Sequence, residues 1–300
     1  MSVWAICLVV VSAFLHAGWN LLSKSNKSSG TAFFLSSSAA ASLVLAPYVI
    51  WYLSQVGVTN IPSTFWWMLL ISGVAQFVYL IGLGHAYKHG DIGVIYPIAR
   101  ALPVLMVGAG TAILGYQLTT LVWGGFILIT IGCLLVPLTS MRQLSVSDYM
   151  NTGVLWAVIA AVGTTGYSIL DKEALHIVDV ELSAIISNLQ SAIFYLGIQF
   201  WTIFLVITIY VIGTRQWNEF SQAWSIKKTS AMAGIMMSTT YGLVLYAMTM
   251  TENVSYVVAL RQLSIVFGMI FGVVFLRERL ALTRSLGTGL IFAGLILSVV

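Results

Sequence analysis

The 300 residues comprise 59% hydrophobic side chains and only 7% charged ones, with 13 Lys and Arg against 9 Asp and Glu. A soluble domain carries about 25% charged residues, so this composition excludes an ordinary soluble enzyme and places the chain in a membrane. The two cysteines, Cys7 and Cys133, have no zinc-type or C-x-x-C spacing, so we expect them to be packing residues.

Ten uncharged apolar stretches follow one another along the chain, and each is close to the length of about 20 residues that spans a bilayer. They cover residues 2–22, 31–53, 64–86, 92–114, 119–138, 151–170, 182–212, 229–250, 254–276 and 285–300. Because an outer-membrane strand alternates over only about 10 residues, these continuous runs predict helices rather than a barrel. The first run lacks a basic n-region and an A-x-A site, which favours a retained helix over a cleaved signal peptide.

The two halves of the chain repeat one another weakly. The segment HAGWNLLSK at residues 16–24 aligns without gaps with TTGYSILDK at residues 164–172, which pairs Lys24 with Lys172. Charged matches carry the most weight, because so few charges are available to coincide. The other matched pairs are Gly18 with Gly166, Trp19 with Tyr167, Leu22 with Leu170, Asp91 with Glu252, Arg100 with Arg261 and, after a one-residue slip, Leu114, Leu118, Gly125 and Gly132 with Leu276, Leu280, Gly287 and Gly294.

This repeat predicts a first five-helix unit at residues 1–138, a connecting loop at 139–150 and a second unit at 151–300. Because an odd number of crossings reverses the chain, the two units enter the membrane from opposite sides. Many secondary transporters are built in this way, with the substrate near the midplane between the repeats. We therefore expect an all-α integral membrane fold of ten transmembrane helices, in two inverted five-helix repeats around a central cavity.

Three segments together resemble the EamA-type branch of the drug/metabolite transporter superfamily. They are the first helix with His-Ala-x-Trp-Asn and a trailing Lys, the helix entered by GDIGVIYPIAR at residues 90–100, and the LRERL turn at residues 276–280. The resemblance covers essentially the whole chain and implies a cavity lined mainly by helices 1, 3, 4, 6, 8 and 9. It also implies outward transport, but members move amino acids, nucleotide sugars, phosphorylated sugars, vitamins and drugs, so it names no substrate.

Arg100 and Arg261 lie inside apolar stretches, where burying an arginine in a bilayer costs about 3 kcal/mol or more. They fall about 12 Å and 10 Å from the first residues of their helices at 1.5 Å per residue. Because these two helices begin on opposite sides of the membrane, the guanidinium groups straddle the midplane of a core about 30 Å thick. That arrangement is expected of a substrate site with alternating access. Two alternatives stay open: an ion pair between the repeats with Asp91 or Glu252, or snorkelling toward the headgroups.

Other polar side chains recur at helical spacing. His16, Trp19 and Asn20 share one face of the first helix, where they either line the cavity or make an interhelical hydrogen bond worth about 0.6 kcal/mol. The remaining candidates for substrate binding are Gln76, Tyr79, Tyr96, Tyr167, Ser168, Tyr241 and Gln262. The candidates for coupling or gating are His16, Asp91, Glu252, Lys24 and Lys172.

Three classes of function were compared. An intramembrane enzyme needs a recognisable motif, but the chain has no H-E-x-x-H or G-x-S-x-G, and KHGD at residues 88–91 places Lys88 where an aspartyl protease motif needs glycine. A channel or scaffold does not require inverted halves with equivalent buried charges. The absence of a P-loop means that a gradient or exchange drives any transport.

We therefore expect a secondary transporter, and not an enzyme, that moves a small polar or amphipathic organic metabolite across a bacterial-style inner membrane. The alternative is uptake or exchange of an anionic, carboxylated or phosphorylated metabolite, because guanidinium pairs bidentately with such groups. The expected partners are membrane lipids, the small solute and a coupling proton. No cofactor, metal ion or nucleic acid is expected, and the sequence leaves the oligomeric state open.

The Lys and Arg residues predict the orientation. The even-numbered connections and the termini hold only Lys172. Relatives of the resembling family commonly keep both termini inside, but the charges place both termini outside and the odd-numbered connections in the cytoplasm. Those odd-numbered connections hold Lys24, Lys27, Lys88, Arg142, Arg215, Lys227, Lys228, Arg277, Arg279 and Arg284.

This orientation predicts the behaviour of reporters fused after Val300. An alkaline phosphatase fusion there should be active and a green fluorescent protein fusion dark, because the positive-inside rule places that end outside the cytoplasm. Bright fluorescence together with an inactive phosphatase would contradict it.

Overall fold

The computed structural model describes residues 1–24, 29–89, 92–138, 151–275 and 281–299, and every regular element in these ranges is a helix. The predicted loop at 139–150 and the LRERL turn lie outside them. The helices are α1 (Val3–Lys24), α2 (Gly30–Val56), the 3-10 helix η1 (Val58–Asn60), α3 (Ser63–His89), α4 (Ile92–Ile113), α5 (Thr120–Leu135), α6 (Thr152–Leu182), α7 (Asn188–Gly213), α8 (Asn218–Ser225), α9 (Lys227–Thr249), α10 (Val254–Leu260), α11 (Leu263–Phe275) and α12 (Leu282–Val299).

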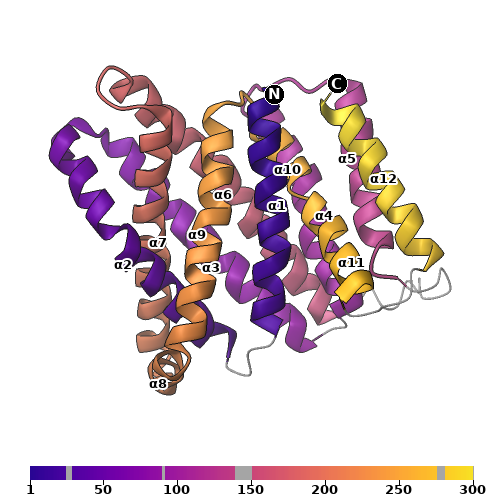
Figure 1. The fold of residues 1–300 in the computed structure, drawn as a ribbon, viewed down its shortest axis with the longest axis horizontal. Coiled ribbons are helices and arrows are strands. Elements are labelled where there is room, and N and C mark those ends of the chain that lie inside the picture. Colours follow the sequence, from indigo (N-terminus) through magenta and orange to yellow (C-terminus); the bar gives the residue numbers. More distant parts are fainter. Residues whose placement is uncertain (25–28, 90–91, 139–150, 276–280, 300) are drawn as a thin grey trace.

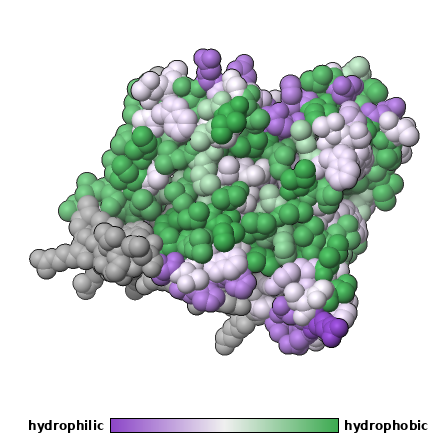
Figure 2. All heavy atoms as spheres, turned by 180° about the vertical axis from the view of Figure 1, so that it is seen from behind, coloured by the Kyte–Doolittle hydropathy of each residue, from purple (hydrophilic) through white to green (hydrophobic). Residues whose placement is uncertain are grey.

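The helices have the length and composition of membrane spans. Among the described residues, six segments are long and apolar enough to cross a bilayer, namely α2, the first 24 residues of α3, α6, α7, α9 and the segment Val254–Phe271. Shorter apolar helices lie within α1, α4, α5 and α12. Apolar residues form a broad belt across the face shown in Figure 2, with polar residues gathered at both ends. The chain is an all-α, multi-pass membrane protein.

The contacts between helices fall into matched sets. α1 packs on α9 as α6 packs on α3, α2 packs on α9 as α7 packs on α3, and α1 packs on α11 as α6 packs on α4. α2 packs on α7 and α5 packs on α12. These five kinds of contact are unchanged when α1, α2, α3, α4 and α5 are exchanged with α6, α7, α9, α10–α11 and α12, whereas the packing of α7 on α9 has, among the described residues, no equally extensive counterpart between α2 and α3. Both termini lie at the same end of the molecule (Figure 1).

Glycines allow α5 and α12 to cross closely. A methyl group built on Gly125 would lie 2.6 Å from the carbonyl oxygen of Gly294, and one on Gly132 would lie 2.6 Å from that of Gly287. The reverse contacts are equally close, at 2.5 Å from Gly294 to the Gly125 oxygen and 2.7 Å from Gly287 to the Gly132 oxygen. Small residues let helix backbones approach in a membrane, where van der Waals packing drives association. The alignment matches Gly125 with Gly287 and Gly132 with Gly294, so exchanging the aligned glycines converts one of these two contacts into the other.

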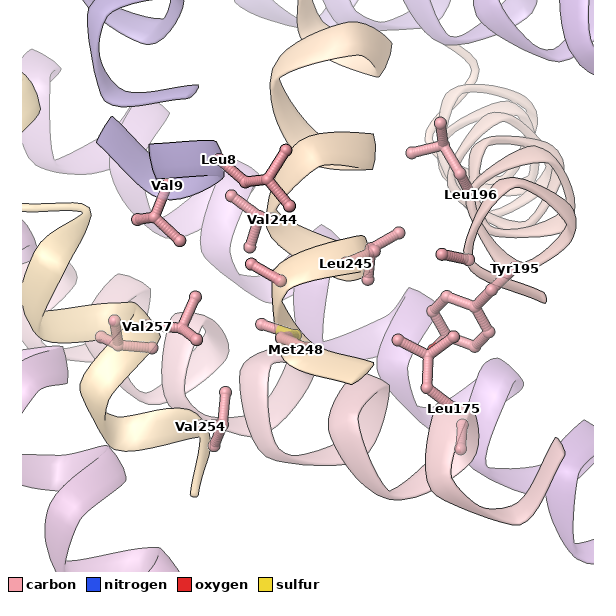
Figure 3. Packing of buried hydrophobic residues seen from close by; sticks show 14 of the residues in the cluster. Leu8, Val9, Leu175, Tyr195, Leu196, Val244, Leu245, Met248, Val254 and Val257 are labelled. Carbon is pink, nitrogen blue, oxygen red and sulfur yellow. The ribbon is translucent and has the colours of Figure 1, made fainter. Parts of the chain in front are cut away.

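Buried apolar side chains fix the helices that surround the centre. Figure 3 shows Leu8 and Val9 of α1 beside Val244 of α9, with Val257 of α10 and Leu175 of α6 nearby. All five side chains are buried. A core packed at this density positions the helices that carry the polar groups described below.

The structure interrupts the helix within the apolar stretch that we expected at residues 254–276, although Val254–Phe271 still has the length and composition of one membrane span. At the junction of α10 and α11, the Gln262 amide donates to the Ala259 carbonyl at 3.0 Å and the Ser264 amide to the Arg261 carbonyl at 3.1 Å. These bonds reach back three residues instead of four, which tightens the chain locally. The Gln262 side-chain amide donates to the Val258 carbonyl at 3.2 Å, so it satisfies an oxygen that the break releases.

The matching helix of the first half behaves differently. α4 continues from Ile92 to Ile113 through Pro97 and Pro103. The sequence analysis also did not anticipate α8, which lies in the connection between α7 and α9.

The α5–α12 crossing predicts different effects of the same substitution at neighbouring glycines. Gly125→Ala should destabilise the protein by about 1–3 kcal/mol, because its methyl group has no room beside the Gly294 oxygen. Gly124→Ala is the matched control, since a methyl group there meets nothing within 4 Å and alanine favours the helix by about 1 kcal/mol. Thermal unfolding in detergent measures both. Equal melting temperatures for the two variants would contradict the account of the crossing.

Candidate functional site

Three ionisable side chains from α1, α4 and the α10–α11 junction meet inside the molecule. His16 lies within electrostatic range of both Arg100 and Arg261. Arg100 donates through Nη2 to the hydroxyl of Ser264, whose own amide donates to the Arg261 carbonyl. Both arginines, which the alignment matches between the two halves, therefore reach the same helix break.

Tyrosines surround Arg261. The Tyr241 ring centroid lies 5.6 Å from the guanidinium carbon, within the range of a cation–π contact. The Tyr167 side chain also lies within electrostatic range of Arg261. The Tyr167 ring packs edge-on against the rings of Tyr241 and Tyr79, with 6.1 Å between the ring centroids in each pair. The described groups that favour the Arg261 charge are these three tyrosines, and none of them is a carboxylate.

Asp91 and Glu252 were the two candidates for an ion pair between the repeats, and Asp91 lies outside the described residues. Glu252 is exposed in the connection between α9 and α10, within electrostatic range of Lys172. Lys172 is buried and donates to the Met248 carbonyl at 2.9 Å, near the end of α9. Lys172 is therefore engaged with the end of α9.

Several buried polar atoms near these groups lack a hydrogen-bond partner within the described part of the chain. They are Gln76 Nε2 on α3, Arg100 Nε on α4, Ser168 Oγ on α6 and Gln262 Oε1 at the break. Such atoms are rare in folded proteins, because each loses its hydrogen bonds to water without replacement. These four atoms have free capacity to bind a ligand or water.

Six of the candidate side chains are partly accessible, although they lie well inside their helices. The residues of this kind are His16, Gln76, Tyr79, Arg100, Tyr241 and Arg261, whereas Tyr167, Ser168 and Gln262 are buried. Partly accessible polar side chains inside the molecule can form hydrogen bonds with a small solute. Of the predicted site residues, the side chains of Trp19, Asn20, Lys24, Asp91 and Tyr96 lie outside the described residues, and their roles stay predictions.

The sequence analysis missed a buried carboxylate. Asp171 on α6 is completely inaccessible. Its Oδ1 accepts hydrogen bonds from Tyr195 at 2.6 Å, from Gln199 Nε2 at 2.8 Å and from Ser72. Its Oδ2 accepts from Gln199 Nε2 at 2.8 Å and from Tyr241. The search for uncharged stretches ended the sixth helix at residue 170, whereas α6 continues to Leu182 and carries the carboxylate into the interior.

A cavity of about 320 Å³ lies at the end of the molecule that carries the N-terminus. It is bounded by the ends of α1, α9 and α10, the three elements that carry His16 and Tyr241 and lead to Arg261. The lining residues are Met1, Ser2, Met250, Thr251, Glu252 and Tyr256.

A family model described as the EamA-like transporter family matches residues 151–300, which is half of the chain. The chain belongs to the EamA-like transporter family. The resemblance seen in the sequence is thus confirmed, and the family indicates a membrane transporter of the drug/metabolite type rather than an enzyme. No curated protein matches the chain.

Solved structures provide a second comparison, with 28 matching chains. One, titled "Crystal structure of protein", has a TM-score of 0.64 at 14% sequence identity, and the match covers 98% of this EamA-like chain and 97% of that one. At so low an identity, the likeness extends to the fold alone.

Proposed function

We propose that this EamA-like protein is a secondary active transporter that moves a small organic solute with an anionic group by alternating access. One observation carries the proposal: Arg100 and Arg261 reach the same helix break, where tyrosines and no described carboxylate face Arg261. Intramembrane charges of this kind mark substrate paths. Guanidinium binds carboxylate or phosphate through two parallel hydrogen bonds, which gives the solute class.

We further propose ten transmembrane helices in two inverted repeats, at residues 1–138 and 151–300, around a central cavity. The exchange pattern of helix contacts and the reciprocal glycine pairs support this arrangement. A helix interrupted at Arg261 supports it as well, because transporters of this construction place broken helices at the binding site.

The two functions expected from the sequence differ in solute and direction. Uptake or exchange of an anionic metabolite agrees with an Arg261 whose described neighbours are tyrosines. Outward transport of a neutral or zwitterionic amphipathic solute is the second candidate, and it rests on the family. For either one we propose an inner-membrane location with both termini outside, which agrees with the two termini lying at one end (Figure 1).

Counterflow in proteoliposomes tests the proposed function. The probes are radiolabelled succinate, a labelled hexose phosphate and labelled leucine. Saturable exchange of either anion, without chemical change, is the expected result. Exchange of leucine alone would favour the second candidate, and chemical conversion of a probe would contradict transport.

The proposed role of the arginines predicts a loss of anion exchange when either arginine is replaced. Arg100→Gln or Arg261→Gln should weaken anion exchange by about 10- to 100-fold, because a hydrogen bond to a charged group contributes about 1.5–3 kcal/mol. Lysine at either position should restore it only in part, since it keeps the charge and loses the planar fork. The control is Lys228→Gln, which removes an exposed cation in the first turn of α9.

Thermal stability measurements on the arginine variants distinguish solute binding by the arginines from a structural ion pair. Stable variants without exchange support the ligand role. Destabilisation by about 3–5 kcal/mol, repaired by Asp91→Asn or Glu252→Gln, would show that the arginines serve a structural ion pair instead.

A further inference from the structure

We propose that Asp171 is the coupling-ion site of this transporter: it binds a proton, and the proton and the solute anion are loaded together. The part about the solute rests on the proposed function, whereas proton binding at Asp171 does not. Asp171 is completely buried and lies within α6, 11 residues before its end at Leu182, which is roughly 16 Å at 1.5 Å per residue.

No cation faces the Asp171 carboxylate among the described groups that act on it. Those groups are Ser72 from α3, Tyr195 and Gln199 from α7, and Tyr241 from α9, and all four are uncharged.

The charged groups on the other elements around α6 are engaged elsewhere. Lys172, the next residue, donates to the Met248 carbonyl. Arg100 on α4 donates to Ser264, and Arg261 at the end of α10 faces tyrosines. A carboxylate buried without a cation is unfavourable, and binding a proton removes that cost.

The neighbours of Asp171 can satisfy both protonation states. Three hydroxyls and an amide nitrogen donate to the charged carboxylate in the structure. A hydroxyl can also accept a hydrogen bond, so one of the three can turn and receive the proton of the neutral acid. Asp171 and these four donors, here called the cage, can therefore gain and lose a proton without a change in the fold.

The cage exists in only one half of the chain. The alignment of the halves pairs Asp171 with Ser23, Ser72 with Ala233 and Tyr241 with Leu80. A purely architectural network would be expected in both halves, as the glycine contacts between α5 and α12 are. A coupling ion needs one site, so its one-sided position agrees with a functional role.

Tyr241 links the carboxylate to the arginine. Its hydroxyl donates to Asp171 and its ring lies 5.6 Å from the Arg261 guanidinium carbon. While Asp171 is charged, its negative field opposes a solute anion and the electron-rich ring holds Arg261. Protonation weakens both effects and leaves Arg261 available to the anion. Proton and anion therefore favour each other's binding, which is the requirement for moving them in the same direction.

Infrared difference spectroscopy tests the proton site with the proton as the probe. Purified protein in liposomes is acidified, and the C=O stretching band of a newly protonated carboxyl is recorded. Asp171→Asn should remove one such band. Asp179→Asn is the matched control on the same helix and should leave the Asp171 band in place. A spectrum in which Asp171→Asn removes no band would overturn the assignment.

Tyr241→Phe provides a second variant in case Asp171→Asn does not fold. It keeps the carboxyl but removes one hydrogen bond to Oδ2, so the Asp171 band should shift in frequency and in the pH at which it appears. A band unaffected by Tyr241→Phe would overturn the cage as the proton site.

Transport measurements test the coupling, with the labelled anion that gives the fastest counterflow. A pH gradient, alkaline inside, should raise accumulation several-fold in the wild type and in Asp179→Asn. Asp171→Asn should keep counterflow and lose the gradient-driven accumulation. Continued accumulation, accumulation driven by a sodium gradient instead, or loss of counterflow in a folded Asp171→Asn protein would each overturn the coupling role. Absence of counterflow in the wild type would contradict the proposed function and leave the infrared result standing.

Discussion

A guanidinium group held by tyrosines inside a membrane protein is the constraint on which the centre of this structure depends. Burying such a group in a bilayer costs about 3 kcal/mol or more, and a cation–π contact returns about 0.5–2 kcal/mol when it is desolvated. Arg261 gains the ring of Tyr241 and has Tyr167 within electrostatic range. These partners come from α9 and α6, so both helices must approach the α10–α11 junction closely.

The packing contacts between small residues are equivalent in the two halves of the chain, whereas the polar groups are not. Close contacts between small residues are reciprocal, as Gly125 with Gly294 and Gly132 with Gly287 show. The polar groups are one-sided: α10–α11 is broken at Arg261 while α4 is continuous through Arg100, and the buried carboxylate occurs on α6. A scaffold with equivalent halves can rock between two arrangements of similar packing energy. A site with unequal halves can give those arrangements different affinities.

The sequence predicted the part of the site that depends on charge in an apolar setting. Arg100 and Arg261 stood out because charges are so scarce, and helical spacing added His16, Tyr79 and Tyr241, which the structure brings to the same centre. The prediction that these residues bind substrate stays a prediction.

Two features escaped the sequence for physical reasons. The break at Arg261 follows Ala259 and Leu260, which are good helix formers, so propensity gives no sign of it. Asp171 was missed because its charge ended an apolar run, whereas four neutral donors from three other helices satisfy it in the fold. Only tertiary contacts supply those donors.

Alternating access to the site is the central claim, and cysteine modification tests it most directly. Ser168 on α6 follows Tyr167, is inaccessible in this structure and has an unpartnered hydroxyl. A Ser168→Cys variant, made with Cys7→Ser and Cys133→Ser, would be treated with a membrane-impermeant maleimide from each side of oriented proteoliposomes. The account predicts modification from both sides, slowed by the exchanged anion. Modification from one side only, or from neither, would contradict it.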